Sequence, residues 1–401
     1  MIGFGEQHSG LAPSRDSKRL PVTSVGVACP RPSGLSSSDG LESPHEPRPL
    51  QTRRRPLTAA PLSLLHDHLD GGLRVDTVLE LADSIGWPLP TTDPGPLAAW
   101  FTAGANSGDL LQYLATFEHT IAVMQTEEHL ERVAYEAAVD LATDGVVYAE
   151  VRFAPELHQQ NGLPLDAVVG AVTAGFRRGE REAIAAGRDF YIGAILCAMR
   201  TEHRSLEIAE LVDRLRGVDD KVLAYDLAGA ETGFPPSLHA EALAFARQRH
   251  LNITLHASEP PDLELISDAL AHGAHRIGHG VRLLADLTID NGEIVAMGQL
   301  AQFVLDRQVP LEVAPTCHVQ IGAVPDLAHH PIGPMLRAGF NVSVNTDNRL
   351  MSNVMPSSEM EAVSTTFGFS AAEQTQLVRN GIDAGFAPID VRRRLAGLLS
   401  T

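Results

Sequence analysis

Short apolar runs alternate with longer amphipathic stretches from Leu62 to the C-terminus, a pattern typical of repeated strand–helix units. Eight of the runs have the length of buried strands. They are Leu62–His66, Val146–Phe153, Tyr191–Cys197, Val222–Leu227, Ile253–His256, Arg276–His279, Pro310–Ala314 and Asn341–Asn345. The segments between them predict helices, for example Ala167–Ala186, Ser205–Leu215, Ser237–His250 and Gly292–Arg307.

Eight strands that are each followed by a helix predict an α/β fold, a closed (β/α)8 TIM barrel. Because the segment Leu73–Thr143 is long and largely helical in pattern, we expect a helical insertion after the first strand. An open doubly wound sheet is the alternative, but no GxGxxG follows the first strand to support it.

Residues 1–61 differ from the rest of the chain, since they carry nine of the 26 prolines and no lasting hydrophobic period. We therefore expect residues 1–61 to be a disordered N-terminal extension and residues 62–401 to be the barrel domain. A targeting peptide is less well supported, because acidic residues such as Asp16 and Asp39 interrupt the segment. Whether residues 1–61 belong to the native protein is left open by the sequence.

Composition narrows the classes of partner. A formal net charge of −19 disfavours binding to nucleic acid or to anionic lipid. No apolar run has the length of a membrane helix, and the first residues lack a secretory pattern, so we expect a soluble cytoplasmic protein. Three cysteines are too few and too scattered for a disulfide framework or a cysteine-based zinc site. The sequence does not indicate the oligomeric state.

Polar residues gather where the predicted strands end, which is where TIM barrels carry their active sites. His66 and His68 close the first strand, two residues apart, and therefore point the same way in an extended chain. The fifth, sixth and eighth strands end in His256-Ala257-Ser258-Glu259, Gly278-His279-Gly280 and Asn345-Thr346-Asp347-Asn348. In a closed barrel these groups converge on one mouth.

Histidine and carboxylate ligands without sulfur suit zinc, although iron, manganese and cobalt also fit. Three histidines and one aspartate leave a coordination position for water, whose pKa the metal lowers towards about 7. A carboxylate near that water that is not itself a ligand can shuttle protons. Glu259, three residues after His256, fits this role.

Taken together, these motifs resemble the adenosine deaminase family. The matching segments occur in the family's order, and they are His66-Asp67-His68-Leu69-Asp70-Gly71, Tyr148–Pro155, Asp226-Leu227-Ala228-Gly229, His256-Ala257-Ser258-Glu259, Gly278-His279-Gly280 and Asn345-Thr346-Asp347-Asn348. The resemblance covers about Leu62 to the C-terminus. It implies hydrolytic deamination of adenosine, and of 2′-deoxyadenosine, to inosine and ammonia, with metal-bound hydroxide attacking purine C6.

The family's residue roles carry over position by position. The resemblance implies one Zn²⁺ per chain, held by His66, His68, His256 and Asp347. It implies that Glu259 is the proton shuttle that meets purine N1 and that His279 positions the metal hydroxide. Asp70 corresponds to the partner of the ribose 5′-hydroxyl, and Gly229 to the backbone donor to purine N3.

Three departures from the family pattern concern the site. Ser258 stands where glycine is usual, so its side chain is expected to crowd a tight place beside the metal. Cys317-His318 replaces Ser-Asn, and we expect His318 to be a polar loop residue rather than a catalytic one. Asn348 replaces an aspartate that contacts purine N7; its amide can donate a hydrogen bond to N7 directly.

Two other functions stay open. A deaminase of another 6-aminopurine nucleoside, such as an aminofutalosine-type compound, would use the same metal site. A catalytically impaired homologue that binds purines without turnover is the other alternative. Deaminases of polynucleotides carry P-C-x-x-C, which does not occur here, so a small-molecule purine nucleoside is the expected partner.

Overall fold

A computed structural model of the chain describes residues 60–107, 112–113 and 116–400. Apart from Ala60 and Pro61, the predicted disordered extension lies outside these ranges.

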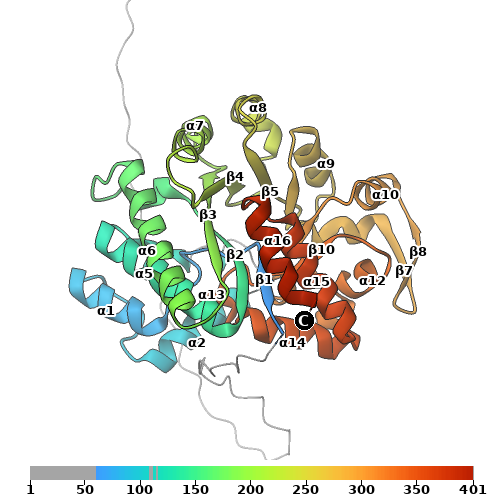
Figure 1. Ribbon diagram of the computed structural model, residues 1–401, viewed down its shortest axis with the longest axis horizontal. Coiled ribbons are helices and arrows are strands. Elements are labelled where there is room, and N and C mark those ends of the chain that lie inside the picture. Colours follow the sequence, from blue (N-terminus) through green and yellow to red (C-terminus); the bar gives the residue numbers. More distant parts are fainter. Residues whose placement is uncertain (1–59, 108–111, 114–115, 401) are drawn as a thin grey trace, which may run out of the picture. The chain divides into compact units, whose positions relative to one another are not determined.

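The eight predicted strands form one parallel sheet in the order β1-β2-β3-β4-β5-β6-β9-β10. Their bounds are β1 Leu62–Leu64, β2 Val146–Phe153, β3 Tyr191–Met199, β4 Val222–Ala228, β5 Asn252–Ala257, β6 Arg276–His279, β9 Leu311–Val313 and β10 Val342–Val344. The strands lie in the centre with helices around them (Figure 1). The sequence-based expectation of a (β/α)8 barrel is confirmed.

The first and last strands meet just beyond their carboxyl ends. Asp67 and Asp347 form a parallel bridge. The backbone N–H of His68 donates to the carbonyl of Asp347 over 2.7 Å, and the N–H of Asp347 donates to the carbonyl of His66 over 2.9 Å. The hydrogen bonds that join β1 to β10 therefore involve three of the predicted metal ligands, which fixes their backbones relative to one another.

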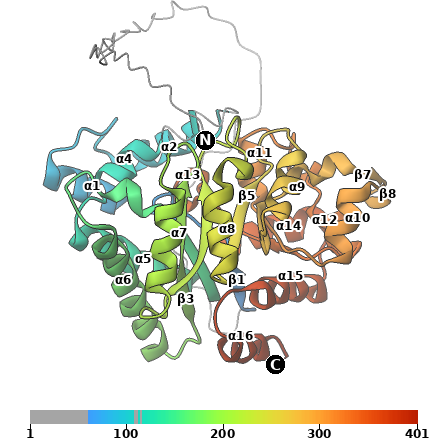
Figure 2. The same ribbon diagram turned by 90° about the horizontal axis from the view of Figure 1, so that it is seen from above.

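Helices cover the outside of the strands and follow them in the chain. Between β1 and β2 lie α1 Val75–Ile85, α2 Pro94–Ala105, α4 Phe117–Ala122 and α5 Glu127–Asp144, so the insertion is largely helical, as expected. The other α-helices of the described residues are α6 Leu165–Ala185, α7 Ser205–Leu215, α8 Ala240–Gln248, α9 Glu264–Ala271, α10 Gln299–Asp306, α11 Pro315–Gln320, α12 Ile332–Arg337, α13 Arg349–Ser352, α14 Pro356–Phe367, α15 Ala371–Ala384 and α16 Ile389–Gly397. In Figure 2, α2, α11 and α13 lie at one end of the barrel and α16 at the other. Among the described helices, none combines the length and apolar character that crossing a membrane requires.

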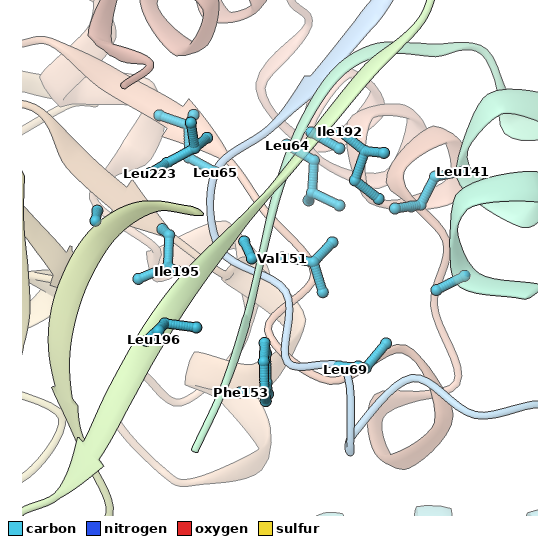
Figure 3. Packing of buried hydrophobic residues seen from close by; sticks show 14 of the residues in the cluster. Leu64, Leu65, Leu69, Leu141, Val151, Phe153, Ile192, Ile195, Leu196 and Leu223 are labelled. Carbon is cyan, nitrogen blue, oxygen red and sulfur yellow. The ribbon is translucent and has the colours of Figure 1, made fainter. Parts of the chain in front are cut away.

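The core consists of apolar side chains that the strands and the surrounding helices share. Leu64 from β1 and Ile192 from β3 are fully buried, as is Leu141 from α5. Figure 3 shows Leu64 and Ile192 on the side of Leu141, where strand side chains pack against a helix.

One predicted helix is wrong in its first half. Gly292–Arg307 was expected to be helical, but β8 Glu293–Met297 pairs with β7 Leu287–Asp290 as an antiparallel hairpin, and helix α10 begins only at Gln299. Asn291 and Gly292, with φ of 49° and 80°, form the two-residue connection. Asn-Gly favours such tight hairpin turns because both residues tolerate positive φ, so the signal was present in the sequence.

Candidate metal centre and active site

The four predicted metal ligands lie together at the carboxyl end of the barrel. His68 Nε2 is 3.1 Å from His256 Nε2, and Asp347 Oδ1 is 3.4 Å from His66 Nε2 and 3.5 Å from His68 Nε2. A zinc ion with metal–nitrogen distances of about 2.0–2.1 Å in tetrahedral geometry separates its ligand atoms by roughly 3.3 Å. The spacing of the four side chains therefore fits a small cation such as Zn²⁺.

Two buried carboxylates orient two of these imidazoles. Glu312 Oε2 lies 2.9 Å from His66 Nδ1, and Asp226 Oδ2 lies 2.9 Å from His256 Nδ1. The hydrogen bond to Glu312 holds a proton on His66 Nδ1 and leaves its Nε2 unprotonated, which is the form that binds a metal. His66 Nε2 is buried and has no hydrogen-bond partner among the described residues, as expected of an atom reserved for a cation.

The carboxylates belong to an ionic cluster inside the barrel that the sequence analysis missed. Glu312 also accepts hydrogen bonds of 2.6 Å from both Arg152 and Arg276, and Arg152 donates to Asp226 over 2.7 Å. All four side chains are at most 1% exposed. The sequence contains a signal for this cluster, because Glu312 interrupts an otherwise apolar strand. A buried charge is tolerated there only if it has charged or hydrogen-bonding partners.

Glu259 lies beside the predicted metal ligands, in the turn that follows β5. Its Oε1 is 3.4 Å from His279 Nε2. Burial, and after it the nearby Glu231 carboxylate, raise the pKa of Glu259 well above its usual value. Glu231, which the sequence analysis did not single out, accepts hydrogen bonds from the backbone N–H groups of Ser258 and Glu259 over 2.7 and 3.3 Å, so it fixes this turn.

The backbone is strained at three positions of the site. Ser258, His279 and Asp347 have φ of 74°, 62° and 58°, in the left-handed region that favours glycine. The family resemblance led us to expect glycine at the position of Ser258, and the positive φ of Ser258 is a reason for glycine to suit this position. Strained residues held by surrounding structure are typical of active sites.

Replacing Ser258 by glycine should raise the free energy of unfolding by about 1–2 kcal/mol, because glycine adopts positive φ without a Cβ clash. The Ser258 hydroxyl is buried and lacks a hydrogen-bond partner among the described residues, so its removal leaves no donor unpaired. Thermal unfolding at fixed zinc concentration measures the change. Ser258→Ala, which removes the hydroxyl and keeps Cβ, is the control; an equal gain from alanine would contradict the explanation by backbone strain.

A cavity of about 260 Å³ opens from these residues. The predicted site residues that line it are His68, Asp70, Gly229, His256, Glu259, His279, Asp347 and Asn348. Apolar side chains complete the wall, including Phe117 and Ile121 from α4, so the helical insertion contributes directly to the cavity. Gly229 lines the cavity with a φ of 93°, and a Cβ there would lie 2.8 Å from Met199, so a larger residue would force Met199 to shift.

Two polar residues of the cavity wall are not predicted metal ligands. Asp70 is buried, and its Oδ1 has no hydrogen-bond partner among the described residues. Asn348 Nδ2 donates to the Tyr113 hydroxyl over 2.6 Å. Because an amide carries two N–H groups, one stays available to an acceptor such as purine N7.

His318 is not the polar loop residue that the sequence analysis favoured. It belongs to α11 and is fully buried, with its Nε2 only 3.0 Å from His279 Nδ1. Its neighbour Cys317 is a buried free cysteine whose sulfur lies within 4.8 Å of carboxylate oxygens of Glu259 and Asp347. The tertiary fold brings His318 and His279 together across 39 residues, a contact that no local pattern indicates.

Comparison with known proteins identifies the family of this chain. The family model described as adenosine deaminase matches residues 61–401. An adenosine deaminase of Mycobacterium sp. (strain KMS) is 48% identical over 341 residues, which cover 84% of this chain and 94% of that protein. Adenosine deaminase 1 of Streptomyces coelicolor is 47% identical over 348 residues, 86% of each protein.

Solved structures share the fold. The adenine deaminase of Arthrobacter aurescens has a TM-score of 0.74 and 27% identity, covering 85% of this chain and 98% of its own. The N6-mAMP deaminase of arabidopsis, with a TM-score of 0.71 and 24% identity over 85% and 98%, supports the fold alone. With a family match over residues 61–401 and relatives at 48% identity, this chain belongs to the adenosine deaminase family.

Proposed function

We propose that this chain hydrolyses adenosine and 2′-deoxyadenosine to inosine and ammonia, using one zinc ion held by His66, His68, His256 and Asp347. The observation that carries the proposal is the convergence of these ligands beside a buried glutamate in a cavity, with three of the ligand pairs 3.1–3.5 Å apart. The curated relatives at 47–48% identity are named adenosine deaminases, which supports the substrate.

Zinc bound there would lower the pKa of a coordinated water towards about 7 and so supply a nucleophile at neutral pH. Glu259 is placed to move protons: its carboxyl donates to purine N1 as C6 is attacked, and its carboxylate takes a proton from the attacking water. The protonated form that the raised pKa favours is the one that can donate. His279, whose Nε2 is 3.4 Å from the same carboxyl, would face the attacking oxygen.

The rest of the cavity positions the nucleoside. The Gly229 backbone N–H would meet purine N3, and the free N–H of Asn348 would meet N7. Asp70 would accept the ribose 5′-hydroxyl, which explains a buried carboxylate oxygen without a protein partner. The apolar side chains of Phe117 and Ile121 would cover the purine and exclude water.

Steady-state deamination of a panel of nucleosides tests the function. Adenosine and 2′-deoxyadenosine should be the best substrates. A much higher kcat/KM for an aminofutalosine-type nucleoside would change the assigned substrate, but the chain would still be a deaminase of a 6-aminopurine nucleoside. Absence of turnover with every 6-aminopurine nucleoside, in zinc-loaded protein that binds purines, would identify an impaired homologue.

Purified protein should contain one zinc ion per chain, measured by elemental analysis. His256→Ala should lower the zinc content far below one per chain, because it removes a ligand whose Nε2 is 3.1 Å from that of His68. His329→Ala, at a histidine whose side chain is 68% exposed, is the control and should keep the metal. Full activity without stoichiometric transition metal would contradict the site, whereas stoichiometric iron, manganese or cobalt would correct only the metal.

Deleting residues 1–55 should leave the melting temperature and kcat/KM unchanged. The segment lacks the apolar content to bury itself, the family match begins at residue 61, and β1 begins at Leu62. Thermal unfolding and adenosine turnover of the truncated protein measure this, and a large drop in melting temperature would contradict it.

The cytoplasmic location also stays a prediction, which fractionation of cells would test.

A further inference from the structure

Three buried histidines form a row that starts at the cavity and runs into the barrel wall. His279 Nδ1 is 3.0 Å from His318 Nε2, and His318 Nδ1 is 2.9 Å from His330 Nε2. Each side chain belongs to a residue that is at most 1% exposed. The rings of His318 and His330 stack, with an interplanar angle of 2°.

The far end of this row determines where every proton sits. The backbone N–H of Ile332 donates to His330 Nδ1 over 3.1 Å, so that nitrogen is an acceptor and carries no proton. The proton of His330 is therefore on Nε2 and points at His318 Nδ1, which must accept it. By the same reasoning His318 is protonated on Nε2 and donates to His279 Nδ1. His279 is left with its proton on Nε2, the nitrogen 3.4 Å from Glu259 Oε1.

We propose that His318 and His330 are positioning residues that hold His279 in one tautomer, as a neutral Nε2–H donor directed at the reaction site. The order of protons in the row follows from the hydrogen bonds alone. Only the identity of the group to which His279 donates rests on the proposed deaminase function. A neutral Nε2–H donates to an oxygen in the cavity and stabilises charge that develops on it. In this state His279 cannot accept a proton at Nε2, which leaves the proton transfers to Glu259.

The row orients His279 and does not conduct protons. A proton wire needs an exit, but this row ends on a backbone amide, which keeps its proton. Burial also lowers the pKa of His330 to about 3, so the last histidine stays neutral at working pH.

Two substitutions at position 318 separate positioning from packing. His318→Leu fills much of the volume but removes the donor to His279 and the acceptor for His330. His318→Gln places an amide nitrogen near the position of ring Nε2, and its oxygen can accept from His330. The leucine variant should lose about 10- to 100-fold in kcat, with KM, zinc content and fold retained. The glutamine variant should recover most of the loss.

Nitrogen NMR of zinc-loaded protein with ¹⁵N-labelled histidine rings reads the tautomers without any turnover. Native enzyme should show His279, His318 and His330 protonated on Nε2 and unprotonated on Nδ1, and His318→Leu should add the other tautomer at His279. His329→Leu, an exposed neighbour of the row, is the control for signal assignment and should change neither tautomers nor kcat.

A proton on His279 Nδ1 in the native enzyme would overturn the proposal, as would a leucine variant with native kcat. Equal losses from glutamine and leucine would also overturn it, because they would reduce His318 to a packing residue. If the native enzyme fails to deaminate adenosine, the proposed function fails, and the tautomer measurement still decides the order of protons in the row.

Discussion

Glu259→Gln should lower kcat for adenosine by about 10²–10⁴-fold while the protein still binds one zinc ion per chain. Glutamine has nearly the same shape as glutamate, so the turn after β5 and the hydrogen bonds to Glu231 should persist. It carries no titratable proton, however, and can neither protonate purine N1 nor take a proton from the attacking water. The Glu259→Gln variant should therefore lose catalytic rate but keep its zinc ion, because the substitution does not change any metal ligand.

Steady-state kinetics with elemental analysis of the same preparation measures this result. The exposed Glu264, on α9, provides the matched control, because Glu264→Gln makes the same chemical change outside the cavity and should leave kcat unaltered. Native turnover in Glu259→Gln would show that another group shuttles protons. Loss of zinc together with activity would instead mean that Glu259 supports the metal site.

The barrel could be predicted from the sequence because its signal is periodic and local. Buried parallel strands read as apolar runs, and the polar residues that end them, such as His66 and Asp347, must share one end of a closed barrel. The Asn291-Gly292 hairpin was missed because a short amphipathic segment can be read as a helix or as a strand. Its turn residues were the better guide.

Contacts between distant segments could not be predicted in the same way. The roles of Glu312, Glu231 and His318 depend on partners supplied by other strands, and one sequence gives no register between strands. Glu312 could at least have been suspected, as a carboxylate between Leu311 and Val313. His318 could not, because only the fold places it between His279 and His330. The strain at Ser258 likewise became visible only with the backbone angle.

Removing the Asp70 side chain should harm adenosine turnover much more than adenine turnover. Asp70 is 4% exposed and has a carboxylate oxygen without a hydrogen-bond partner among the described residues. A nucleoside would supply that partner with its ribose 5′-hydroxyl, in a charge-assisted contact worth about 1.5–3 kcal/mol. Asp70→Ala should therefore lower kcat/KM for adenosine by about 10- to 150-fold. Free adenine has no ribose, so its low kcat/KM should change little.

The same carboxyl group should make AMP a poor substrate of the native enzyme. None of the described residues that line the cavity is lysine or arginine, so a 5′-phosphate would find no cation to neutralise it. A phosphate placed next to Asp70 would also be repelled whenever the carboxyl is ionised. We expect kcat/KM for AMP to be far below that for adenosine.

The decisive measurement is kcat/KM for adenosine, 2′-deoxyadenosine, adenine and AMP in native protein, Asp70→Ala and Asp70→Asn. The asparagine variant keeps an oxygen that can accept from the 5′-hydroxyl but lacks the charge, so it should fall between the other two. Adenosine and 2′-deoxyadenosine should suffer alike, because the contact involves the 5′-hydroxyl that both carry. If AMP or adenine proves the best substrate of the native enzyme, the chain keeps its family and its metal chemistry, but Asp70 loses the role of ribose partner.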